Sequence, residues 1–218
     1  MKAVTEHLHV SIPAGHAALD GELSVPPDAT GLVLFAHGSG SSRHSPRNKY
    51  VAEVLIEHSL GALLVDLLTA DEEREDEYNA RLRFDIGLLA DRVVDITDWL
   101  AVQPQAAGHT LGVFGASTGA AAALLAAARR PKLVKAVVSR GGRPDLAGPD
   151  TALVRAPTLL IVGGRDPEVL RMNRDAQALM KCENRLDIVP GATHLFEEPG
   201  TLAKVAKLAA DWFAAHLK

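Results

Sequence analysis

The sequence predicts an α/β fold with a doubly wound, mostly parallel sheet. Short apolar runs that suit buried strands alternate with amphipathic stretches of helical length along the 218 residues. Short loops that contain glycine and proline join these segments. Because a helix between two parallel strands crosses over in a right-handed sense, successive helices should cover both faces of the sheet. We expect a single domain over residues 1–218, since α/β folds of this length commonly stay undivided.

The N-terminal segments predict an edge hairpin followed by the first parallel unit. Residues 5–12 and 17–25 alternate polar with apolar side chains and should pair as antiparallel strands. Residues 31–36 are apolar throughout, which is typical of a strand buried on both faces. A helix over residues 46–58 and a buried strand over residues 62–66 follow.

An acidic block occupies residues 71–77 and is the densest run of charge in the chain. Such a run usually marks a solvated surface, so we interpret it as a loop and rank a partner or cation site below that interpretation. Residues 82–100 place apolar side chains at helical spacing and predict one long amphipathic helix, which Pro104 and Gly108 close.

The C-terminal half repeats the alternation of strand and helix. Apolar runs predict strands over residues 110–114, 136–139 and 158–162, and a further strand is expected over residues 185–189. Helical patterns cover residues 120–128, 168–180 and 202–217. In parallel sheets, functional groups collect at the carboxyl ends of the strands. The polar residues at these ends are His37, Asp66, Ser117, Arg140, Asp166 and His194.

The composition excludes several classes of function. A formal net charge of −4 gives no reason to expect a nucleic-acid partner. Cys182 is the only cysteine, which excludes an internal disulfide and a cysteine-based zinc site, and we expect no metal and no cofactor. The N-terminus lacks a signal-peptide pattern and no apolar run reaches the roughly 20 residues that span a bilayer. We therefore expect a cytoplasmic protein without a membrane partner, and the oligomeric state stays open.

Residues 115–119, Gly-Ala-Ser-Thr-Gly, form the motif around which the chain is organised. They lie between an apolar strand and an alanine-rich helix, the context in which G-x-S-x-G marks a nucleophile elbow. So sharp a turn leaves no room for a Cβ at the flanking glycines and pushes the serine hydroxyl outward. Ser117 is therefore the candidate nucleophile. The motif also occurs by chance in chains rich in glycine and alanine, so the assignment depends on its partners.

A serine nucleophile needs a histidine base and a carboxylate that orients the base. His194 follows the last predicted strand, whereas His109 precedes its strand and His216 lies on the terminal helix. Asp166 follows the preceding strand, which gives the chain order serine, aspartate, histidine of the α/β-hydrolases. Asp145, farther from its own strand, is the alternative acid.

Two backbone N–H groups are expected to stabilise the oxyanion that forms on an acyl group. Thr118 begins the helix after the serine, where N–H groups lack intrahelical partners. The second donor should come from the loop after residues 31–36, and we select the N–H of Ser39. His37 is expected to brace this loop through a hydrogen bond and to stay outside the chemistry.

Little sequence remains for a lid, because the connection between Ser139 and Thr158 is short and has no pattern of helical length. The site should be shallow and open, which favours short acyl groups or an accessible ester. Arginines in the loops at the expected rim are Arg43, Arg47, Arg140 and Arg143. Their simplest interpretation is surface arginine, but together they could bind a carboxylate or phosphate of the substrate.

These motifs together resemble the α/β-hydrolase superfamily and, within it, the small lidless enzymes of the dienelactone hydrolase family. The resemblance covers essentially the whole chain, from the opening hairpin through residues 37–40, 66–69, 115–119, 163–166 and 191–194. It implies an α/β-hydrolase fold with no lid or a minimal one, and hydrolysis of a small-molecule ester or lactone through an acyl-enzyme. Dienelactone hydrolase proper carries a cysteine at the elbow, whereas this chain carries Ser117. That departure favours a general carboxylic-ester hydrolase with a serine, histidine, aspartate triad.

Two other functions fit the same residues. An acyl-enzyme can pass its acyl group to an alcohol, an amine or a peroxide instead of water, which would make the protein an acyltransferase or perhydrolase. A protein of this fold can also bind a ligand without catalysis. The presence of Ser117, Asp166 and His194 argues against a binding protein, because binding alone does not need all of them.

Overall fold

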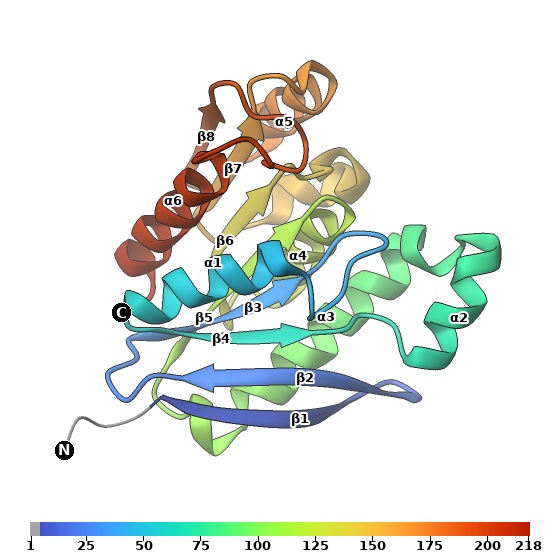
Figure 1. The fold of residues 1–218 in the computed structure, drawn as a ribbon, viewed down its shortest axis with the longest axis vertical. Helices are drawn as coiled ribbons and strands as arrows, with labels where there is room; N and C mark the ends of the chain where they lie inside the picture. Colours follow the sequence, from blue (N-terminus) through green and yellow to red (C-terminus); the bar gives the residue numbers. More distant parts are fainter. Residues whose placement is uncertain (1–4) are drawn as a thin grey trace.

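An eight-stranded sheet runs through the molecule (Figure 1). The computed structural model describes residues 5–218. The strands are β1 (Glu6–Ala14), β2 (Ala17–Val25), β3 (Gly31–Ala36), β4 (Leu60–Val65), β5 (Thr110–Ala116), β6 (Val134–Arg140), β7 (Thr158–Gly163) and β8 (Asn184–Val189). They lie in the order β1-β2-β4-β3-β5-β6-β7-β8. β1 pairs antiparallel with β2, and β2 with β4, whereas the pairs from β4 to β8 are parallel, which confirms the edge hairpin and the doubly wound sheet.

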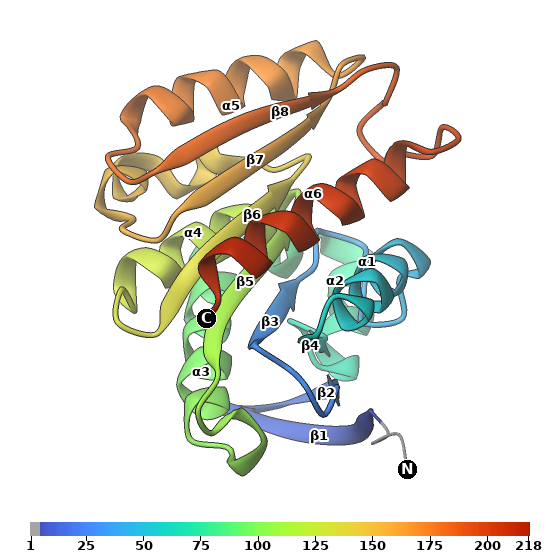
Figure 2. The ribbon, with the colours of Figure 1, turned by 90° about the vertical axis from the view of Figure 1, so that its left-hand side faces the viewer.

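Helices cover both faces of this sheet (Figure 2). They are α1 (Pro46–Glu57), α2 (Ala70–Asn79), α3 (Ile86–Ala101), α4 (Thr118–Arg129), α5 (Pro167–Leu179) and α6 (Thr201–His216). α1 and α6 pack together on one face, and α3 and α4 pack together on the other. β3, β4 and β7 are buried at every position, as their continuous apolar runs predict. The carboxyl ends of the parallel strands meet at one edge of the sheet, where the candidate residues lie.

The acidic block forms helix α2, so the loop expected there is wrong. Thr69 caps this helix: its hydroxyl accepts the N–H of Glu72, and its own N–H donates to the Glu72 carboxylate at 2.8 Å. Arg92 on α3 binds both carboxylate oxygens of Glu72. Asp76 faces inward and pairs with Arg83. Neutralisation of two acidic groups by arginines from outside the block makes the helix stable despite its charge.

The helix expected over residues 82–100 begins later and is preceded by a separate turn. Leu82–Phe84 form a single 3₁₀ turn, and α3 starts at Ile86. Asp85 separates the two because its carboxylate accepts the N–H of Leu88 at 3.0 Å, which is the geometry of a helix N-cap.

The connection between β6 and β7 contains short helical turns and no lid. A 3₁₀ segment spans Pro144–Leu153 and is interrupted at Gly148, whose φ of 57° and ψ of −141° lie outside helical geometry. The segment packs against α4 and α5 at the side of the sheet. The carboxyl edge above Ser117 therefore lacks the inserted helical lid that a longer connection would provide.

Candidate active site

Ser117 occupies a strained turn between β5 and α4. Its φ of 51° and ψ of −120° are rare for a residue other than glycine, and such strain is typical of a nucleophile elbow. A Cβ on Gly115 would lie 2.5 Å from Cα of Ala120, and one on Gly119 would collide with the carbonyl oxygen of Ala36. Both glycines of the motif are therefore required by close packing, as the sequence predicts.

The structure brings His194 and Asp166 together. Nδ1 of His194, in the loop after β8, lies 2.8 Å from Oδ2 of Asp166, in the loop after β7. The alternative acid, Asp145, is instead held by Arg143, whose Nε and Nη2 donate to it at 2.9 and 2.8 Å. The two candidate acids are thus distinguished by their partners, and only Asp166 contacts the imidazole.

The end of β6 links Ser117 to the aspartate–histidine pair. The N–H of Ser117 donates to the carbonyl of Arg140 at 3.2 Å, and a Cβ on the next residue, Gly141, would lie 3.5 Å from the His194 ring. Ser117 and His194 therefore flank the same short segment of backbone. Among residues 5–218, the imidazole hydrogen bonds to Asp166 alone, and its Nε2 makes no hydrogen bond to the Ser117 hydroxyl.

The loop after β3 lies directly against Ser117. A Cβ on Gly38 would come within 2.9 Å of Cβ of Ser117, so only glycine fits this approach. The N–H of Ser39 donates to Oγ1 of Thr118 at 3.0 Å. The sequence reasoning did not foresee that the N–H group selected as a donor would already be bonded to the Thr118 hydroxyl.

His37 braces this loop, as expected. Its Nε2 accepts the N–H of Leu67 at 2.9 Å, so the ring proton is on Nδ1, which donates to the carbonyl of Gly38 at 2.9 Å. Burial lowers the pKa of His37, against smaller raising effects of this hydrogen bond and of Asp66. A neutral imidazole therefore ties the end of β3 to the end of β4.

The loop that carries His194 is anchored by a residue that the sequence analysis missed. The carboxylate of Glu198 accepts the N–H of Thr193 at 3.1 and 3.2 Å, and hydrogen bonding from Thr193 lowers the pKa of Glu198. Phe196 is 1% exposed and has a φ of 55°. This anchoring depends on the local turn, and the sequence signals it only through an acidic residue placed just before α6.

The structure separates the four arginines expected at the rim. Arg43 donates its N–H to Asp66 at 2.6 Å and also binds the same carboxylate through its guanidinium. Arg143 is engaged by Asp145. The other two do not lie in loops as expected: Arg47 is in α1, and Arg140 is the last residue of β6 and is 9% exposed. Arg47 lies inside the helix that the sequence predicts over residues 46–58, so a loop position for it was inconsistent with that helix. Arg140 lies in β6 because this strand ends one residue later than the apolar pattern over residues 136–139 indicates.

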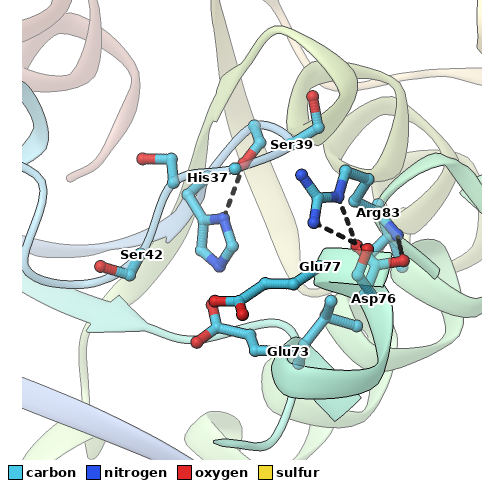
Figure 3. Close-up of a pocket in the computed structure, with 12 residues that line it drawn as sticks. His37, Ser39, Ser42, Glu73, Asp76, Glu77 and Arg83 are labelled. Atoms are coloured by element: carbon cyan, nitrogen blue, oxygen red, sulfur yellow. Dashed lines mark hydrogen bonds and ion pairs between the residues drawn. The ribbon is translucent and has the colours of Figure 1, made fainter. Parts of the chain in front are cut away.

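A cavity of about 360 Å³ lies between the loop of residues 37–42 and helix α2 (Figure 3). Glu73 and Glu77 point into it from α2, and residues of the loop, among them Ser39 and Ser42, border it from the other side. Partial burial, and then the charges of Asp66 and Glu77, raise the pKa of Glu73. Ser117 and His194 do not line this cavity. Its acidic wall was missed because the acidic block was expected to be a loop.

Within residues 5–218, no group of three or more histidine, cysteine, aspartate or glutamate side chains is arranged to hold a metal ion. In the same part of the chain, none of the helices has both the length and the apolar character to cross a membrane.

A parallel sheet of this strand order, with a serine on the sharp turn after β5 and an aspartate–histidine pair beside it, defines an α/β-hydrolase fold. The model of the dienelactone hydrolase family matches residues 20–217, and the chain belongs to this family of hydrolases. The crystal structure of a dienelactone hydrolase from Anabaena variabilis is 56% identical, with a TM-score of 0.96, and the match covers 98% of this chain and 99% of the other.

More distant structures share the fold. A serine hydrolase without a lid from Xanthomonas campestris has a TM-score of 0.74 and 19% identity, over 96% of this chain and 94% of the other.

A curated protein of Mycobacterium tuberculosis (strain H37Rv), provisionally named a phosphoribosyl transferase, is 60% identical over 208 residues. That match covers 95% of this chain and 46% of the relative, so the chain spans about half the length of this protein.

Proposed function

We propose that the protein hydrolyses carboxylic esters or lactones through an acyl-enzyme formed on Ser117. The observation that carries this proposal is the pairing of Asp166 with His194 beside a serine on a strained elbow. Membership of a hydrolase family supports it. Family membership alone leaves the nucleophile and the substrate undecided, so the assignment depends on this geometry.

In the proposed mechanism, Nε2 of His194 takes the proton of Ser117 as Oγ attacks the acyl carbonyl. The tetrahedral intermediate then expels the alcohol, which receives the proton from Nε2 as its bond to the acyl carbon breaks. Water attacks the acyl-enzyme, gives a proton to the same nitrogen, and the acid leaves as the serine recovers its proton. Asp166 accepts a hydrogen bond from Nδ1 throughout, which keeps Nε2 available as the base.

The oxyanion would be stabilised by the N–H groups of Thr118 and Ser39. The N–H of Ser39 donates to the Thr118 hydroxyl at 3.0 Å, so it must break this hydrogen bond before it can donate to the oxyanion. This exchange is favourable because a hydrogen bond to a charged oxygen is stronger than one to a neutral hydroxyl. The Thr118 hydroxyl thus holds the donor in place until the reaction begins.

The open carboxyl edge suits short or accessible esters. The cavity beside the loop of residues 37–42 is bordered by serine residues of this loop and by the carboxylates of Glu73 and Glu77. These polar walls oppose a long alkyl chain and favour a polar substituent on the part of the substrate that extends toward α2.

The test is labelling by a fluorophosphonate and the pre-steady-state burst of nitrophenol from 4-nitrophenyl esters. Both should occur in the wild-type protein and be absent in Ser117→Ala. Ser11→Ala, at an exposed position on edge strand β1, is the matched control and should behave as wild type. A burst that persists in Ser117→Ala would refute the nucleophile.

Transfer of the acyl group to an alcohol, an amine or a peroxide would use the same intermediate. It is distinguished by adding each acceptor and measuring the ratio of transfer product to acid. A non-catalytic binding role predicts no labelling of Ser117. The phosphoribosyl transferase name belongs to proteins about twice as long, and we propose that it does not describe the part matched here.

A further inference from the structure

Arg140 is a buried cation beside the candidate nucleophile. It ends β6, and its carbonyl accepts the N–H of Ser117 at 3.2 Å. Its side chain lies on the sheet face covered by α1 and α6, because Cζ sits 6.0 Å from the ring centroid of Phe114, which belongs to that core. Only 9% of Arg140 is exposed.

Within residues 5–218, the Arg140 guanidinium has no ion-pair partner, and its buried Nη1 makes no hydrogen bond. Burial of an unpaired cation is unfavourable, chiefly because the charge loses its hydration. The ring of Phe114 is at the outer limit of a cation–π contact, so it offsets only part of this cost. Burial, and then the charge of Arg47, lower the pKa of Arg140 to about 10, so the side chain remains charged at neutral pH.

A second arginine, Arg47, is near enough for its charge to act on Arg140, and its own partner is weak. Arg47 is in the first turn of α1, its Nε is buried without a partner, and Nη1 reaches Glu197 at 3.4 Å. The Glu197 side chain is 64% exposed, so this pair is weak and easily displaced. Ser45, at the N-cap of α1, makes no side-chain hydrogen bond to the helix, which leaves the positive end of the helix dipole open.

The other two arginines expected at the rim are not free to bind an anion, because each is paired with a carboxylate. Arg43 is held by Asp66 and Arg143 by Asp145. The charges of Arg47 and Arg140 act on each other unfavourably, and an anion bound to both would offset the repulsion and part of the desolvation cost. Figure 1 shows the N-terminus of α1 at the edge where the parallel strands end, the same edge as the elbow.

We propose that Arg140 and Arg47 form a binding site for an anionic oxyacid group of the substrate, a carboxylate or a phosphate, beside Ser117. This inference rests on the proposed hydrolase function and narrows its substrates to esters that carry a negative charge. Planar guanidinium groups bind both kinds of anion through paired hydrogen bonds, so the two sources are separated by experiment.

The experiment compares esters of equal acyl length. Mono-4-nitrophenyl adipate carries a carboxylate, 4-nitrophenyl 5-phosphonopentanoate carries a phosphonate, and 4-nitrophenyl hexanoate is neutral. A second set, 4-acetoxybenzoate, 4-acetoxyphenyl phosphate and methyl 4-acetoxybenzoate, places the charge on the leaving alcohol. The measured quantity is the ratio of kcat/KM for each anionic ester to that for its neutral match.

We expect a ratio of about 10 to 100 in the wild-type protein, the range for hydrogen bonds to charged groups. Arg140→Met and Arg47→Met should bring the ratio near or below about 1, and Arg140→Lys should fall between because it lacks the planar fork. Arg129→Met is the matched control: it removes an exposed arginine at the C-terminal end of α4 that pairs with Asp91 of α3. This variant should keep the wild-type ratio. Arg47 is partly exposed, so its variant provides the test if Arg140→Met fails to fold.

A measurement independent of turnover is the rise in melting temperature with inorganic phosphate, which should occur in wild type and Arg129→Met and be absent in Arg140→Met and Arg47→Met. A larger ratio for the esters that carry a phosphonate or phosphate identifies phosphate, and a larger ratio for those that carry a carboxylate identifies a carboxylate. Ratios near 1 in the wild type, or ratios that survive in both arginine variants, overturn the anion site while Ser117-dependent hydrolysis of neutral esters stands. Absence of any Ser117-dependent hydrolysis refutes the hydrolase, and the phosphate shift then decides the anion site by itself.

Discussion

Replacing Asp166 with asparagine should nearly abolish esterase activity and leave the fold intact. Oδ2 of Asp166 accepts the hydrogen bond from Nδ1 of His194 at 2.8 Å. An asparagine amide can instead donate to Nδ1, which moves the ring proton to Nε2 and removes the base for Ser117. Triads in which the orienting carboxylate becomes an amide lose about 10⁴-fold in kcat, so we expect a loss of about 10³- to 10⁴-fold here.

The same change should cost less than about 1 kcal/mol of stability, because the His194 side chain is 40% exposed and water screens the pair. The assay is kcat/KM with a neutral 4-nitrophenyl ester, beside a urea unfolding curve for each protein. Asp145→Asn is the matched control, since Asp145 contacts Arg143 and leaves the imidazole untouched. The reasoning fails if Asp166→Asn keeps more than about a tenth of the activity, or if Asp145→Asn loses more than Asp166→Asn.

Two further predictions concern stability. Ser117→Gly should be inactive but more stable by about 1 kcal/mol, because glycine adopts a φ of 51° without strain; a melting temperature below that of Ser117→Ala would contradict this. The pKa of Glu72 is lowered, chiefly by the hydrogen bond from Arg92 and against the effect of partial burial. A depressed folded pKa stabilises the protein above the unfolded value of 4.5, and this contribution is lost as the pH falls through the folded pKa. Urea midpoints should therefore fall less between about pH 5 and pH 3 in Glu72→Gln than in wild type, and equal losses would exclude this linkage.

The fold and the placement of the candidate residues at one edge of the sheet could be predicted because each depends on local pattern. β3 and β7 are continuous apolar runs, and such runs are stable only where both faces are covered. The glycines around Ser117 are needed for packing within the same turn. Asp166 and His194 follow successive strands of a parallel sheet, whose ends lie at one edge by topology.

The errors arose where distant residues decide local structure. The acidic run of α2 is a helix because Arg92 and Arg83, from later in the chain, neutralise Glu72 and Asp76. No pattern within the run itself carries that information. The bond between Ser39 and Thr118 likewise joins residues 79 positions apart, and sequence reasoning has no means to find it.

The sequence by itself determined the class of fold, the sharp turn at Ser117 and the placement of Asp166 and His194 after successive strands, because strand periodicity and turn chemistry are encoded in neighbouring residues. Only the tertiary structure decided that Asp166 and not Asp145 contacts His194. It also decided that, within the described part of the chain, Arg140 has no carboxylate partner and Arg47 only the exposed Glu197, while Arg43 and Arg143 are paired. The physical reason is that ion pairing depends on distances of a few ångströms between side chains from separate elements, and those distances are set by packing of the whole sheet and its helices.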